Sequence, residues 1–444
     1  RGTFAIDGYD GDADDFPTMD KAAFNGHFYS DKAIGVSLLG IPVYAVMHAA
    51  SLVTGIPWHL QLKIYVVRMA TASVPAAVAL ALMWIIMVRE SVPPRRAFFA
   101  VATVFCGSWW FGYSTLAMPY APGIAALLGA LILVLYPAGA ELTTAAACGV
   151  GGLCGFALIC DLTFALMVFP IAVLFLFTVA RYSTRIAIQL SSAAVVAAGI
   201  PLLIYVAHTF AIFGKPTIPY YYIVVPLFRE GTQQGFLGIG APRIGAAWFL
   251  TVHPYRGIFF WSPWMVLAVI GCIWQLCWPR IGRRLWGAIG LWAFVSYLTL
   301  DSGYYMWWGG WSMGPRIMSP MLAVLPFGLI PILRAGHPRR WWWWSFIAAA
   351  AVSLLLCVPV SFINPQVEEG NSYERLRWAA VGDPLDVPQF RYLRMYYAGE
   401  FFFQDRVPRH LAMRILPLMA FVAAGGVLWR TGMRYPPSTR ASSI

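Results

Sequence analysis

The segment at residues 25–32, NGHFYSDK, places charged side chains directly before a long apolar run. Asp31 offers a carboxylate that can take a proton. Lys32 offers an ammonium that meets a phosphate as a point charge. His27 and Tyr29 are further ligand candidates in the same segment. The structural alternative is a lysine that extends its charge toward the lipid headgroups and pairs with its neighbour.

Two later segments place an arginine where an apolar run begins. HPYRG contains His253, Tyr255 and Arg256, and the Trp- and Gly-rich stretch at residues 301–316 contains Trp311 and ends in Arg316. Arginine binds phosphate in a bidentate manner. At the edge of a membrane it needs a partner or a wet cavity. The alternatives are a headgroup anchor for the arginine and an aromatic belt for the tryptophans.

Arg68 is a weaker candidate near the end of an apolar run. It is expected to bind phosphate or to pair with Asp161, which the sequence also allows as a helix cap.

These segments must be positioned by membrane helices. The chain is 60% hydrophobic and 11% charged, against roughly 25% charged residues in soluble domains. Uncharged runs near the ~20 residues that span a bilayer predict an all-α, polytopic membrane protein with about eleven transmembrane helices. The predicted spans are 64–88, 97–116, 121–136, 142–160, 162–180, 186–213, 257–278, 285–300, 317–333, 341–362 and 411–429.

Basic clusters fix the predicted orientation. Strict alternation of the spans brings five clusters to one side, which the positive-inside rule makes cytoplasmic. That side then carries the whole net charge of +12, which favours an anionic inner leaflet and gives no support to nucleic-acid binding. The clusters are Arg89, Arg95 and Arg96; Arg181 and Arg185; Arg280, Arg283 and Arg284; Arg334, Arg339 and Arg340; and Arg430, Arg434 and Arg440.

The long polar segments consequently face the extracytoplasmic side. The predicted organisation is a first loop (1–63), helices (64–213), a second loop (214–256), helices with a short loop at 301–316 (257–362), a third loop (363–410), a last helix (411–429) and a basic cytoplasmic tail (430–444). Counting the apolar run at 33–54 as a span would reverse every later cluster, so it is predicted to form interfacial helices. Because the chain begins with Arg1, an upstream twelfth helix is expected.

Five segments carry a resemblance to a known family: NGHFYSDKAIGVSLLGIP, LKIYVVRMATASVPAAVAL, GTQQGFLGIG, HPYRGIFFWSP and WGGWSMGPRIMSPMLAVLPF. They resemble bacterial GT-C membrane glycosyltransferases related to protein O-mannosyltransferases and the lipid A aminoarabinose transferase. The resemblance implies transfer of a sugar from a polyprenyl-phosphate donor to an extracytoplasmic protein, lipid or envelope glycan, in the bacterial inner membrane. It implies that Lys32, Arg256 and Arg316 bind the phosphate leaving group.

The family's catalytic base is an acidic residue of the first outer loop that usually lies farther upstream than this sequence begins. Asp7, Asp20 and Asp31 are the candidates present in this chain. A non-catalytic subunit of a membrane complex is therefore an alternative, and a lipid or solute transporter is another. No cofactor is implied, His and Cys show no metal-ligand spacing, and a divalent metal stays open because outer carboxylates are plentiful.

Overall fold

The computed structural model describes residues 3–9, 20–137, 139, 141–277, 281–334, 340–367 and 387–398. These ranges are mostly helical, as the sequence predicts. The α-helices are α1 Gly35–Thr54, α2 Leu60–Arg68, α3 Val74–Arg89, α4 Pro94–Cys106, α5 Trp110–Tyr113, α6 Tyr120–Leu135, α7 Thr144–Cys160, α8 Ala165–Val179, α9 Thr184–Phe213, α10 Pro226–Gln233, α11 Ile244–Thr251, α12 Ile258–Trp261, α13 Trp264–Cys277, α14 Ile281–Gly303, α15 Ile330–Leu333, α16 Arg340–Ile363 and α18 Pro388–Tyr397. The predicted span at 411–429 lies outside the described residues.

The predicted number of eleven spans is not confirmed. Within the described ranges, five helices are long and apolar enough to cross a membrane, or six if one bent pair forms a single span. Three further apolar helices, α6, α7 and α13, have only 16, 17 and 14 residues. At 1.5 Å per residue they cover about 21–26 Å, less than the ~30 Å of a typical hydrocarbon core. The five are Gly35–Thr54, Leu60–Arg89, Leu162–Val179, Thr184–Phe213 and Arg340–Ile363.

The predicted span at 317–333 is not one regular helix. It consists of two 3-10 helices, η5 (Arg316–Ala323) and η6 (Leu325–Leu329), followed by α15, with a bend of 53° between the two halves. Pro320, Pro326 and Pro331 each lack the N–H that an α-helix needs, which explains the break. The segment is buried almost completely, so the rest of the protein supplies its surroundings.

The first loop contains a β-hairpin that the all-α prediction missed. Strands β1 (Lys21–Phe24) and β2 (His27–Ser30) pair antiparallel, with Ala22 opposite Tyr29. The turn is Asn25-Gly26, and both residues have positive φ, 49° and 80°. Asn-Gly between two short strands is a strong local signal for a hairpin, so this element was predictable.

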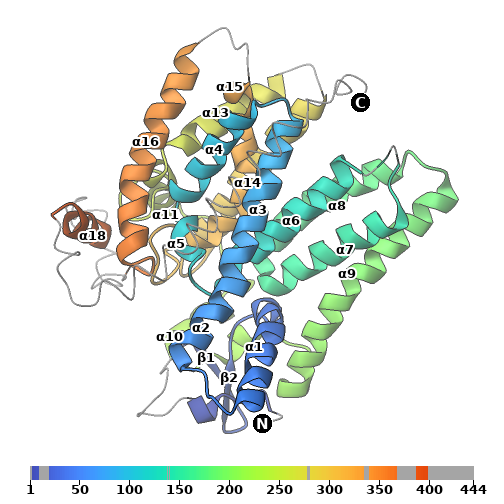
Figure 1. The fold of residues 1–444 in the computed structure, drawn as a ribbon, viewed down its shortest axis with the longest axis vertical. Helices are drawn as coiled ribbons and strands as arrows, with labels where there is room; N and C mark the ends of the chain where they lie inside the picture. The colour runs from blue at the N-terminus through green and yellow to red at the C-terminus, as the bar shows by residue number, and fades with distance from the viewer. Residues whose placement is uncertain are drawn as a thin grey trace.

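Helix α1 follows the hairpin and passes the length and apolarity test for a span. It packs on α2 at the hairpin end of the molecule (Figure 1). A Cβ on Gly40 would lie 3.3 Å from Val67, so the two helices approach closely there. Most of the remaining surface of α1 is apolar and exposed, and Val53 is 87% exposed. This surface suits lipid contact, and the interfacial placement of α1 stays a prediction.

Several segments that the sequence assigns to opposite sides of a membrane lie toward opposite ends of the molecule. Figure 1 shows α1, the hairpin and α10 at one end of the molecule and α15 at the other, with α7 and α9 running beside each other. At the α15 end, three segments predicted to be cytoplasmic come together through Glu90. Its carboxylate accepts from Tyr136 (Oη to Oε1, 2.7 Å) and lies 3.5 Å from Arg334, whose Nε donates to the Glu90 carbonyl (2.9 Å). Arg96 donates to the carbonyls of Leu333 and Arg334 at 3.1 and 3.0 Å.

Replacing Glu90 with alanine is expected to destabilise the protein by about 1–3 kcal/mol, since it removes the partner of two mostly buried polar groups. Thermal unfolding of the detergent-solubilised protein measures the effect as a lower Tm. Glu141→Ala is the matched control, because Glu141 is exposed. Equal melting of the two variants would contradict the proposed role of Glu90.

Candidate functional site

The hairpin brings three charged residues together where β2 ends. The Lys32 ammonium lies 2.9 Å from Oδ2 of Asp31 and 3.2 Å from Oδ2 of Asp20. Its backbone N–H donates to the Ser30 hydroxyl at 3.2 Å, which fixes the chain next to the ion pair. The tertiary structure thus joins two of the predicted acids with the predicted phosphate ligand.

The hairpin is held in place by the second loop. The backbone N–H of Val224 donates to the carbonyl of Lys21 (2.9 Å), and Ala22 forms an isolated bridge with Ile223. Phe24 packs edge-on against Phe213 at the end of α9, with ring centroids 5.3 Å apart. The preceding 3-10 helix η4 (Pro219–Tyr222) therefore lies beside the charged residues.

Asp31 has an unusual environment for a carboxylate. It is 1% exposed, and its Oδ1 has no hydrogen-bond partner within the described ranges. Burial raises the pKa of Asp31 above the usual value, and the Lys32 charge and hydrogen bond offset part of that increase. A buried carboxyl with a raised pKa and one free oxygen can act as a general base nearer neutral pH.

Arg316 begins η5 and is half-buried. Within the part of the chain that the structure describes, no hydrogen bond or ion pair of its guanidinium is found. Its side chain lies beside Gly309, where a Cβ would be 3.1 Å from Cγ of Arg316 and where φ is +74°. An arginine held in this way is available to an anion.

Electrostatic contacts join Arg316 to the hairpin residues. The charge of Asp20 acts on Arg316, and both Asp31 and Arg316 act on Tyr220, whose ring lies 5.6 Å from the Lys32 ammonium. Burial, as the main cause, raises the pKa of the Tyr220 hydroxyl well above its usual value, so Tyr220 stays a neutral donor. Arg316 also acts on Tyr120 of α6, on Asp301 in the last turn of α14 and on Tyr304, which follows α14. The term polar centre is used below for Asp20, Asp31, Lys32, Tyr120, Tyr220, Asp301 and Arg316.

Arg256 makes different contacts from Arg316. It is fully buried, and its guanidinium donates to the carbonyls of Trp308 (3.0 Å), Gly310 (3.1 Å) and Tyr255 (3.3 Å). The Tyr255 ring stacks on the guanidinium at 4.1 Å, and Gln389 donates to the Tyr255 carbonyl. These contacts occupy the Arg256 donors in holding the 308–310 backbone, so they support a positioning role more than direct phosphate contact.

The remaining predicted residues are spread over other places. His253 is nearly buried, its Nδ1 accepts from the Tyr255 N–H (3.1 Å), and burial lowers its pKa. Trp311 is 57% exposed. Tyr29 packs against Phe213, with centroids 6.2 Å apart. None of these three residues belongs to the polar centre.

His27 and Asp7 pair with each other on the outside of the hairpin, with Nδ1 3.0 Å from Oδ2. The Phe28 N–H also donates to Asp7 (2.8 Å), and this hydrogen bond, together with His27, holds the pKa of Asp7 below its usual value. Such a carboxylate is a weak base. Arg68 ends α2 and makes no ion pair with Asp161 in the described ranges. Asp161 caps η3 (Leu162–Phe164) by accepting from the Thr163 N–H at 2.9 Å, as the capping alternative predicts.

Sequence reasoning missed Asp301 as a site residue. It is fully buried at the end of α14, and neither carboxylate oxygen has a hydrogen-bond partner within the described ranges. An ionisable residue at the end of an apolar span was the available signal. Tyr120 and Tyr220 gave no comparable signal, because tyrosine is common at membrane interfaces.

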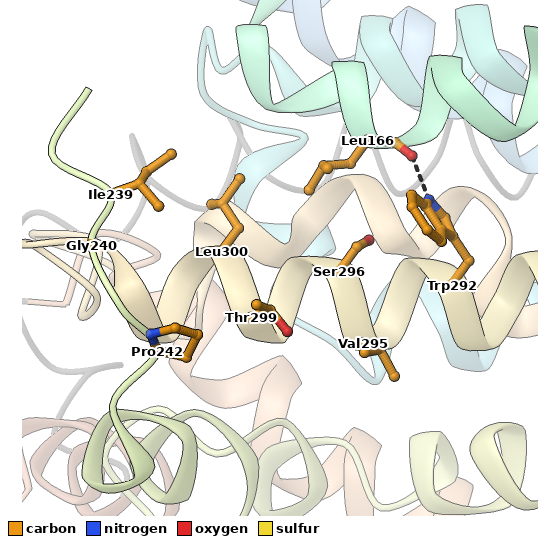
Figure 2. Close-up of a pocket in the computed structure, with 9 residues that line it drawn as sticks. All are labelled: Leu166, Ile239, Gly240, Pro242, Trp292, Val295, Ser296, Thr299 and Leu300. Carbon is orange, nitrogen blue, oxygen red and sulfur yellow. Dashed lines mark hydrogen bonds between the residues drawn. The ribbon is translucent and has the colours of Figure 1, made fainter. Parts of the chain in front are cut away.

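An apolar cavity of about 410 Å³ runs along one face of α14 (Figure 2). One end is formed by Ile239, Gly240 and Pro242. Leu166 of α8 also lines the cavity, and its backbone carbonyl accepts a hydrogen bond from Nε1 of Trp292 (2.7 Å). The α14 side of the cavity ends at Leu300, one residue before Asp301. It is lined by Trp292, Val295, Ser296, Thr299 and Leu300 of α14.

Among the described residues, no group of three or more His, Cys, Asp or Glu side chains is arranged to hold a metal ion. Comparisons of this chain with protein-family models, with curated proteins and with solved structures find no match. The polar centre and the apolar cavity are therefore the features of the structure that bear on function.

Proposed function

We propose that the protein is a membrane glycosyltransferase that moves a sugar from a polyprenyl-phosphate donor to an acceptor. The observation that carries the proposal is the half-buried guanidinium of Arg316, which has no hydrogen bond or ion pair among the described residues and belongs to the same polar centre as Lys32, Asp20 and Asp31. Two cations near a buried carboxylate suit a reaction in which a phosphate group leaves and a proton is removed. The proposal places this centre on the extracytoplasmic face of a bacterial inner membrane.

Lys32 and Arg316 are assigned to the phosphate. When the bond between the anomeric carbon and the phosphate oxygen breaks, the departing polyprenyl phosphate gains negative charge. Cations fixed in a site that is partly shielded from water stabilise this charge more than they would in bulk solvent. Arg256 is assigned to hold the 308–310 backbone.

Asp31 is the best candidate for the general base among the three predicted acids. Asp7 is tied to Phe28 and His27, and Asp20 is 53% exposed. Of these three acids, Asp31 is the buried one, and its Oδ1 has no hydrogen-bond partner within the described ranges. In the proposed step the acceptor hydroxyl oxygen attacks the anomeric carbon, its proton passes to Asp31, and polyprenyl phosphate leaves.

The cavity along α14 supports a lipid-linked donor. Its lining is mostly apolar, and it ends one residue from Asp301 of the polar centre. We assign it to isoprene units of the donor, whose phosphate would then lie toward Arg316. A soluble nucleotide-sugar donor would gain nothing from an apolar channel at this position.

The test is transfer of radiolabelled mannose or glucose from the corresponding phosphoundecaprenol in membranes that contain the protein. Asp31→Asn is expected to lower kcat/KM by about 100- to 10,000-fold, since general-base catalysis contributes that much. Because burial raises the pKa of Asp31, the wild-type activity is expected to fall with decreasing pH at a higher pH than an ordinary aspartate gives. The remaining activity of Asp31→Asn should lack this acid limb.

Lys32→Ala is expected to reduce transfer as well, whereas the exposed Lys215→Ala serves as the matched control. If the wild type binds the donors but transfers no sugar, the protein is a non-catalytic subunit rather than an enzyme. An acid limb that persists in Asp31→Asn would exclude Asp31 as the base.

A further inference from the structure

Asp301 is a described residue whose burial and lack of hydrogen-bond partners the proposed reaction does not yet explain. Its side chain is 0% exposed, and both Oδ1 and Oδ2 lack hydrogen-bond donors within the described ranges. A buried carboxylate without donors is strongly disfavoured, so such a group either takes up a proton or pairs with a ligand or a cation. Burial, as the main cause, raises the pKa of Asp301 well above its usual value, and the Arg316 charge offsets part of that increase. Hydrogen-bond donors from a ligand would favour the ionised form further.

The backbone around Asp301 is fixed. The carbonyl of Asp301 accepts from the Tyr304 N–H (3.1 Å), which closes the end of α14. The carbonyls of the next two residues, Ser302 and Gly303, accept from the N–H groups of Arg243 (3.2 Å) and Gly240 (2.9 Å). The backbone that carries Asp301 is therefore fixed by the loop at 240–243, which limits how far the carboxyl group can move on binding a ligand.

Asp301 interacts electrostatically with Arg316, the proposed phosphate ligand, and with Tyr120. It does not line the apolar cavity, whose α14 residues end at Leu300. A group that bound Asp301 would thus be polar and would lie beside the phosphate rather than among the isoprene units.

We propose that Asp301 recognises the sugar of the donor by accepting hydrogen bonds from two neighbouring hydroxyl groups, one on each carboxylate oxygen. This inference rests on the proposed function, since it deepens the description of the same site. A carboxylate has two acceptor oxygens in one plane, and adjacent hydroxyls of a sugar ring supply two donors at a matching spacing. Asp301 is then a specificity-determining residue that separates the sugar-linked donor from the sugar-free carrier.

The experiment compares binding of mannosyl- and glucosyl-phosphoundecaprenol with binding of sugar-free undecaprenyl phosphate to the purified protein in nanodiscs. Asp301→Asn is expected to weaken binding of at least one sugar lipid by about 10- to 100-fold, the size of one lost charge-assisted hydrogen bond, because asparagine keeps one of the two acceptor oxygens. Binding of undecaprenyl phosphate should not weaken, because the substitution removes a carboxyl group that interacts with Arg316. Ser302→Ala is the matched control, because the adjacent Ser302 hydroxyl is equally buried and donates only to the Thr299 carbonyl of its own helix.

Donor lipids whose sugar lacks one hydroxyl group provide a second measurement, which can be made on the wild-type protein. Removal of one contacted hydroxyl from the bound sugar lipid should weaken its binding to the wild type and should cause a smaller loss in Asp301→Asn. Equal binding of all deoxy donors by the wild type, or equal weakening of sugar lipid and sugar-free carrier in Asp301→Asn, would overturn the assignment of Asp301. Failure of the wild type to bind any of these lipids would instead overturn the proposed function, and the Asp301 role with it.

Discussion

Replacing Arg316 with glutamine is expected to lower sugar transfer by about 100- to 1000-fold, the typical loss when one fixed donor to a developing charge is removed. The reason is that Arg316 has no hydrogen bond or ion pair within the described ranges, so its charge is free to act on the leaving phosphate. The effect should appear in kcat as well as in binding of undecaprenyl phosphate. Transfer of radiolabelled sugar in membranes measures the first, and lipid titration in nanodiscs measures the second.

Two further variants show whether the loss of sugar transfer in Arg316→Gln comes from the missing phosphate contact. Arg316→Lys keeps a positive charge but loses bidentate geometry, so it should retain part of the activity. Arg229→Gln changes an exposed arginine of α10 and should transfer sugar like the wild type. Normal transfer by a stably folded Arg316→Gln would refute the assignment of the phosphate to Arg316.

Replacing Gly151 with alanine is expected to cause a large loss of stability, about 3 kcal/mol or slightly more. Helices α7 and α9 approach closely at this glycine, and a Cβ on it would collide with the Ala194 carbonyl oxygen. One turn later, a Cβ on Gly155 would lie only 2.5 Å from the Ala198 carbonyl oxygen. Two glycines four residues apart are a common way to bring membrane helices into close contact. The added methyl group would have to separate the two backbones, because neither carbonyl belongs to a side chain that can rotate away.

The neighbouring glycine supplies the control. A Cβ on Gly152 would meet nothing closer than the Ala197 carbonyl at 3.9 Å, an ordinary contact. Gly152→Ala is therefore expected to be neutral or to stabilise α7 by up to about 1 kcal/mol through helix propensity. Thermal unfolding in detergent distinguishes the two variants, and equal melting temperatures would contradict the close α7–α9 crossing.

Part of the candidate site followed from residue types along the chain. Asp31, Lys32 and Arg316 were recognisable because each is a charged residue beside an apolar run, where a charge is costly without a function. The hairpin was equally accessible through its Asn25-Gly26 turn, and the all-α prediction overlooked it. The predicted number of spans is not confirmed within the described residues, because several apolar runs form helices shorter than a bilayer and prolines break the run at 317–333.

The sequence by itself determined that the protein is helical and membrane-embedded, since composition and the length of apolar runs are properties of the chain alone. Only the tertiary structure separated Arg256 from Arg316, which have similar sequence contexts. The donors of Arg256 reach carbonyls 52 and 54 residues away, whereas Arg316 has no such partner within the described ranges. The tertiary structure likewise revealed that the carboxyl group of Asp301 has no hydrogen-bond partner within the described ranges. Whether a polar group is satisfied depends on atoms from distant segments, and no local pattern contains that information.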